Sequence, residues 1–131
     1  MHLTFNGLEI QAMKNRLLAF VFALRGIKHG WKREVHLRIH TLAAVVAIML
    51  GILLRINLWE WCVVLLSIGI VISAELMNAA IERLADRITK EKDPLIGQAK
   101  DLAAGAVLIV SLVALVLGMI IFLPKLWLFF S

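Results

Sequence analysis

The chain lacks most of the features of disulfide-bonded, zinc-binding or common nucleotide-binding proteins. Its single cysteine, Cys62, excludes an internal disulfide, and no Cys/His spacing resembles a zinc site. Tyrosine is absent, there are two prolines, and the eight glycines are scattered. Neither a GxxxxGK(S/T) phosphate loop nor a GxGxxG fingerprint occurs. The sequence therefore excludes the common soluble kinase and dinucleotide-binding classes.

Charged residues are also scarce. They make up 18% of the 131 residues, whereas 62% are hydrophobic and the mean hydropathy is +0.93. A soluble domain of this composition would lack the polar surface to cover its core, so we expect an all-α integral membrane protein. The net charge is +5, but the basic residues lie beside hydrophobic segments. This placement favours anionic lipid headgroups and argues against a nucleic-acid partner.

Three segments are candidates for membrane spans. The clearest, over residues 100–123, contains twenty-two consecutive uncharged residues. A second covers 58–86, and its last turns are expected to leave the lipid as a cytoplasmic extension. The weakest has an uncharged core of only fourteen residues. It is long enough to span over 36–56 if Arg38 extends its charged end to the interface.

The N-terminal region has a different pattern. Apolar side chains from Met13 to Trp31 recur at intervals of three and four residues, and basic side chains gather on another face. This pattern predicts an amphipathic helix over 12–33 that lies in the membrane surface. A charged leader that only orients the first span remains an alternative. No small-residue cleavage site follows, so we treat 1–131 as a single membrane domain.

The distribution of basic residues predicts the orientation. Residues 1–40 carry seven Lys and Arg and residues 83–100 carry five, whereas Arg55 and Lys125 stand alone in the first loop and the tail. By the positive-inside rule the N-terminus and the second loop are cytoplasmic.

Glu75 is the most unusual residue in this arrangement. It ends an uncharged run from Trp61 to Ala74, and a charged residue at mid-bilayer costs about 2.5–3.5 kcal/mol, less toward the interface. On a helix Glu75, Asn78 and Glu82 share one face at i, i+3 and i+7. That face is the candidate active site.

Further polar residues belong to the same interfacial level. They are Glu34, Asp86, Lys100 and Asp101. Carboxylates of this kind suit Mg²⁺, which is usually held by one or two acids plus substrate phosphates, and Lys100 would meet a phosphate as a point charge. Phosphoryl transfer also needs a carboxylate that accepts the proton of a hydroxyl, and Glu75 is the acid nearest the lipid. The pattern predicts a metal–nucleotide site.

Other interpretations remain open. One alternative is that the charges beyond the second span, Glu82 and Asp86 with Arg83 and Arg87, are solvated and pair with one another along the helix. His36 and His40 are also one turn apart, and interfacial hydrogen bonding is favoured for them over metal binding. A small transporter or channel would use Glu75 to line a polar path, and a scaffold would only recruit partners. The charges cluster at one interface, which argues against a relay.

Two stretches carry a family resemblance. Residues 74–82, AELMNAAIE, are followed by Asp86 and then by residues 99–108, AKDLAAGAVL. These motifs resemble the small prokaryotic diacylglycerol kinase and undecaprenol kinase family. The resemblance extends over roughly 15–127 and includes residues 34–38.

The resemblance implies a homotrimer with three transmembrane helices and a surface helix per subunit, in the bacterial inner membrane, with composite active sites that face the cytoplasm. It implies Mg²⁺ as cofactor, ATP as co-substrate and a membrane lipid alcohol as acceptor. Glu75 is then the catalytic base, Asn78 an orienting residue, and Glu34 and Glu82 magnesium ligands beside the nucleotide. Other nucleotide contacts are implied for Glu91, Lys92, Asp93, Lys100, Asp101 and Phe22, and lipid contacts for Glu75, Arg38 and Trp31.

The resemblance also bears on the choice of lipid. The stretch Arg38-Ile-His40, the run over 103–106 and the tail over 122–127 are more similar to the undecaprenol kinase branch. We therefore expect undecaprenol to be converted to undecaprenyl phosphate. A diacylglycerol kinase that makes phosphatidic acid is the alternative.

Overall fold

The computed structural model describes residues 7–89, 91 and 93–131, with side chains from residue 11 onward. Within these residues the chain forms four helices, α1 (Gly7–Arg33), α2 (Val35–Leu53), α3 (Leu58–Ile88) and α4 (Pro94–Phe130), and no strand. The expected all-α fold is confirmed. The chain divides after Arg33 into two units. Helix α1 is therefore described by itself, and α2 to α4 form the second unit.

Helices α2, α3 and α4 are each long and apolar enough to cross a membrane, as expected. Little of their surface is covered within the chain, because only 11%, 22% and 11% of the residues in their most apolar windows are buried. Where the lipid begins and ends along each helix stays a prediction. The surface position of α1 also stays a prediction, although its described side chains, which begin at residue 11, are almost all exposed.

The last helix is longer than the expected span on both sides. Asp93 caps its N-terminus, since its Oδ1 accepts hydrogen bonds from the backbone of Leu95 at 2.8 Å and Ile96 at 3.2 Å, and Pro94 takes the first helical position. At the other end α4 continues through Pro124 to Phe130. A proline removes a single backbone donor, and membrane helices tolerate this loss where neighbouring groups compensate.

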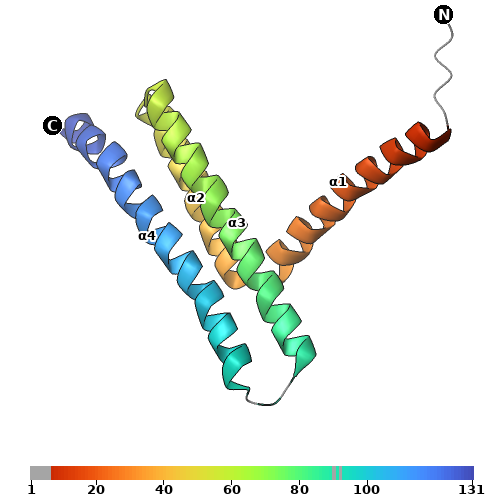
Figure 1. Cartoon of the computed structure of the whole chain (residues 1–131). Coiled ribbons are helices and arrows are strands. Elements are labelled where there is room, and N and C mark those ends of the chain that lie inside the picture. The colour runs from red at the N-terminus through yellow and green to blue at the C-terminus, as the bar shows by residue number, and fades with distance from the viewer. Residues whose placement is uncertain (1–6, 90, 92) are drawn as a thin grey trace, which may run out of the picture. The chain divides into compact units, whose positions relative to one another are not determined.

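Helix α3 holds the second unit together. It packs against both α2 and α4, and Figure 1 shows α2 beside α3 and a short loop joining α3 to α4. The residues that α3 buries include Val64, Val71, Glu75 and Ala79. The last three lie one turn apart, so they form a stripe along one face. The only charged residue in that stripe is Glu75.

A tight connection sets the antiparallel pairing of α2 and α3. The Ile56 N–H donates to the Gly51 carbonyl at 3.1 Å and the Arg55 N–H donates to the Ile52 carbonyl at 3.3 Å. With Arg55 at a φ of 49°, this is a Schellman ending with an unusual non-glycine residue in the left-handed position. Ile56 is buried in a small core with Val64, Ile121 and Phe122.

The start of α3 is fixed by side chains. Asn57 and Glu60 form a reciprocal capping box, in which Asn57 Oδ1 accepts from the Glu60 backbone at 3.0 Å and Glu60 Oε2 accepts from the Asn57 backbone at 2.7 Å. Lys125 of α4 lies 3.2 Å from Glu60 Oε2. This end of the unit therefore has its own polar contacts, at the opposite end of α3 from the candidate site.

Gly51 provides a test of this packing. A Cβ at position 51 would lie 2.8 Å from Trp61 Cη2 and 3.1 Å from Ile56 Cδ1, whereas a Cβ at Gly69 would meet nothing within 4 Å. We expect Gly51→Ala to destabilise the protein by about 1–3 kcal/mol through overpacking. Thermal unfolding in detergent micelles measures the loss, with Gly69→Ala as the matched control. Equal stability of the two variants would contradict the packing described here.

Candidate active site

Glu75 lies where the buried stripe of α3 approaches the end of the unit that carries the α3–α4 loop. Its residue exposure is 5%, and Val71 and Ala79 flank it one turn away on either side. The Glu75 Oε1 atom is 3.1 Å from Nε2 of His40 on α2. The carboxylate therefore faces the neighbouring helix, among apolar side chains, with an imidazole as its partner. Burial of a charge among apolar groups costs free energy unless it is hydrogen-bonded.

Asn78 and Glu82 continue the same face toward the end of α3. The Asn78 amide nitrogen donates to Glu82 Oε1 at 3.3 Å. The Asn78 Oδ1 atom is buried and has no hydrogen-bond partner among the described residues. Seven residues of α-helix separate Glu75 from Glu82 by about 10 Å along the axis, with Asn78 in between. An unpartnered amide oxygen thus lies between two carboxylates.

Glu34 joins this level from α2. It occupies the N-cap position of α2 but makes no side-chain capping bond. Instead its Oε1 accepts a hydrogen bond from Arg83 Nη2 at 2.7 Å. Because Arg83 follows Glu82 in the chain, this ion pair brings the start of α2 to the level of Glu82.

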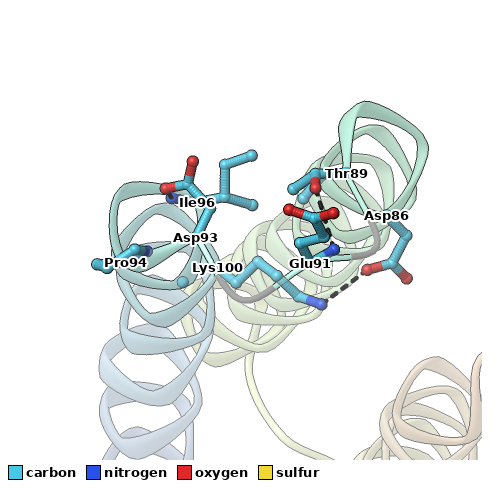
Figure 2. A pocket seen from close by; sticks show the side chains of 9 residues that line it. Asp86, Thr89, Glu91, Asp93, Pro94, Ile96 and Lys100 are labelled. Atoms are coloured by element: carbon cyan, nitrogen blue, oxygen red, sulfur yellow. Dashed lines mark hydrogen bonds and ion pairs between the residues drawn. The ribbon is translucent and has the colours of Figure 1, made fainter.

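A second polar region lies at the α3–α4 loop. Figure 2 shows the Lys100 ammonium directed at Asp86, with Nζ 2.9 Å from Oδ1. Both residues line an open pocket of about 620 Å³, together with Ala85, Thr89, Glu91, Asp93, Pro94, Ile96 and Gly97. The pocket has a cation at one wall and three carboxylates around it. It is a suitable place for a polar ligand that carries both anionic and donor groups.

The structure brings together some of the predicted site residues and not others. Glu75, Asn78 and Glu82 share a face of α3, Glu34 lies at the same level, and Glu91, Asp93 and Lys100 line the loop pocket. Asp101 and Arg38 are exposed and make no side-chain hydrogen bond or ion pair to the described residues. Phe22 and Trp31 belong to α1, where the Arg25 guanidinium lies 5.8 Å from the centre of the Phe22 ring. Lys92 lies outside the described residues.

The side-chain oxygens near the end of α3 are candidate ligands for Mg²⁺. No group of three or more His, Cys, Asp or Glu suited to a metal occurs within the described residues. Mg²⁺ does not need such a cage, because it is usually held by one or two carboxylates with phosphate and water oxygens. The half-buried Glu82 carboxylate beside the unpartnered Asn78 Oδ1 fits that requirement.

Three contacts between different segments were not predicted from the sequence. His40 was expected to form interfacial hydrogen bonds, but its contact with Glu75 was not predicted. Arg83 and Asp86 were considered as neighbours within one helix, whereas the structure pairs them with Glu34 and Lys100 on other segments. One sequence signal could have indicated the contact between His40 and Glu75. Each of the two residues lies at the apolar edge of its predicted span, His40 in the first and Glu75 in the second.

The sequence is similar to a known protein family and to several of its members. Residues 21–122 match the family described as prokaryotic diacylglycerol kinase. The chain is 41% identical over 108 residues to the undecaprenol kinase of Bacillus subtilis, which covers 82% of this chain and 88% of that protein. It is 32% identical over 117 residues to a diacylglycerol kinase of Synechocystis, covering 88% and 67%, and 30% identical over 95 residues to that of Escherichia coli K12, covering 72% and 78%.

The three long apolar helices and these relatives together define a multi-pass membrane phosphotransferase that acts on an alcohol group of a lipid. The chain belongs to the prokaryotic diacylglycerol kinase family. The predicted lipid kinase class is therefore confirmed, and membership of a kinase family implies ATP as the phosphate donor.

Proposed function

We propose that the protein transfers the γ-phosphoryl group of ATP to the hydroxyl of undecaprenol, with Glu75 as the base that accepts the hydroxyl proton. The observation that carries this proposal is the buried Glu75 carboxylate, which lies among apolar side chains two turns of α3 before Glu82. A lipid alcohol reaches this level from the membrane and a nucleotide from the water. General acid–base chemistry requires such a group within hydrogen-bonding reach of the proton it removes.

The neighbouring residues receive roles that match their positions. Asn78, with its unpartnered Oδ1, orients the reacting groups one turn from Glu75. Glu82 and Glu34 hold magnesium, which when bound neutralises charge on the transferred phosphate. Glu34 Oε1 accepts from Arg83 at 2.7 Å, which leaves Oε2 as the oxygen that would bind the metal.

The nucleotide is proposed to lie along the water-exposed end of α3 and α4. Lys100, Glu91 and Asp93 line the loop pocket there. Asp101, Lys92 and Phe22 complete the proposed nucleotide contacts on the family resemblance alone. Asp93 has a second role, because its carboxylate caps α4.

Arg38 and Trp31 are proposed to contact the lipid headgroup region. Arg38 is exposed on α2 one turn after Glu34, and Trp31 is 50% exposed on α1. We place this end of the helices at the cytoplasmic face of the bacterial inner membrane, since residues 1–40 and 83–100 carry twelve of the fourteen Lys and Arg.

We propose a homotrimer whose subunits share their active sites. This assembly is carried over from the family resemblance. The apolar helices also leave most of their side chains uncovered. Lipid and neighbouring subunits would together cover this surface.

Diacylglycerol is the second candidate substrate, because the Synechocystis and Escherichia coli relatives are named diacylglycerol kinases. The relative with 41% identity is named undecaprenol kinase, which favours undecaprenol. We expect kcat/KM in mixed micelles with Mg-ATP to be higher for undecaprenol by about 10-fold or more. Equal or faster turnover of diacylglycerol would reverse the assignment of the lipid and leave the kinase reaction intact.

The role of Glu75 is tested by Glu75→Gln, which keeps the shape and removes the basic oxygen. We expect turnover to fall by about 10²- to 10⁴-fold, the usual contribution of a general base. Glu60→Gln is the matched control, because Glu60 lies at the opposite end of α3 and pairs with Lys125. Unimpaired turnover in Glu75→Gln would remove Glu75 as the base.

A further inference from the structure

His40 is the partner of the one charged residue in the buried stripe of α3. Its Nε2 lies 3.1 Å from Glu75 Oε1, and the side chains are 26% and 6% exposed, respectively. Within the described residues no other side chain forms a hydrogen bond or ion pair with Glu75. Asn78 and Glu82, the nearest polar residues along α3, bond to each other. The orientation of the Glu75 carboxylate therefore depends on this one contact from α2.

We propose that His40 is a positioning residue for phosphoryl transfer: its Nε2–H donates to Glu75 Oε1 and holds the carboxylate so that Oε2 receives the proton of the lipid hydroxyl. The inference rests on the proposed role of Glu75 as base. His40 keeps its proton throughout. The hydroxyl proton passes to Glu75 while the new oxygen–phosphorus bond forms and the bond from the γ-phosphorus to ADP breaks.

The need for such a contact follows from the environment of Glu75. A glutamate side chain has three rotatable bonds, and fixing a side chain of this length costs up to about 2 kcal/mol of conformational entropy. The apolar neighbours Val71 and Ala79 restrict its volume but offer no directional bond. A hydrogen bond from a side chain that is itself held in place sets the direction of the second oxygen.

His40 lies on a well-anchored turn of α2. The preceding turn of α2 contains Leu37, which is 2% exposed, and the Thr41 hydroxyl donates to the Leu37 carbonyl at 2.7 Å. His40 also lines one end of an apolar groove of about 820 Å³ between α2, α3 and α4. The imidazole thus contacts both Glu75 and the apolar space from which a lipid hydroxyl would approach.

The two ring nitrogens allow a sharp test. The amide nitrogen of a glutamine at position 40 can occupy the place of the histidine Nε2. An asparagine side chain is shorter, and its amide nitrogen occupies the place of Nδ1. We therefore compare His40→Ala, His40→Gln and His40→Asn by measuring kcat and the KM for ATP and for the lipid. The matched control is His36→Ala, because His36 is an exposed histidine one turn earlier on α2.

We expect His40→Ala and His40→Asn to lower kcat by about 10- to 100-fold, with either KM changing by less than about 3-fold. His40→Gln should recover most of kcat, and His36→Ala should match the wild type. In a Glu75→Gln background, His40→Ala should cause no further loss, since the two residues act through one contact.

Several results would overturn the inference. Full kcat in His40→Ala, an effect confined to KM, or equal losses in the Gln and Asn variants would each exclude a positioning role. These results leave the proposed function standing if Glu75→Gln is inactive. If Glu75→Gln is fully active, the base assignment fails and the inference fails with it. If His40→Ala does not fold, the difference in kcat between His40→Gln and His40→Asn tests the positioning role.

Discussion

A carboxylate enclosed by apolar side chains is costly, and the contact between Glu75 and His40 is what compensates for it in this structure. The two residues lie on different helices, 3.1 Å apart, so the contact exists only when α2 and α3 pack in the observed register. That register is set far away, where Gly51 lets Trp61 approach α2 and the Arg55 turn reverses the chain. Packing at one end of α2 and α3 thereby determines whether Glu75 and His40 meet near the other end.

The end of the unit that carries the α3–α4 loop is organised differently. Its contacts are ion pairs between helices, Glu34 with Arg83 and Asp86 with Lys100. Exposed pairs of this type contribute little to stability, about 0–1 kcal/mol each, so they can open when a charged ligand competes for them. The proposed nucleotide site, which admits and releases its ligand, needs such contacts. Glu75 is buried and held by His40, whereas the charged residues at the loop end can exchange partners.

Sequence patterns predicted the helices because apolar length and charge distribution depend on local residues alone. The shared face of Glu75, Asn78 and Glu82 followed from helical periodicity for the same reason. Partners across helices were not predictable, because the contact of His40 with Glu75 and that of Arg83 with Glu34 depend on how two helices align. The continuation of α4 through Pro124 was also missed, since the loss of one backbone bond does not end a long apolar helix.

The central claim is that the buried carboxylate lies at the cytoplasmic boundary of the membrane, and residue labelling tests it most directly. In a Cys62→Ser background, a single cysteine is introduced by Arg87→Cys at the end of α3 that carries Glu75, or by Trp59→Cys at the opposite end, both at exposed positions. With a membrane-impermeant maleimide, intact cells should label only the cysteine at position 59, and permeabilised cells should label both. Labelling of position 87 in intact cells would contradict the account.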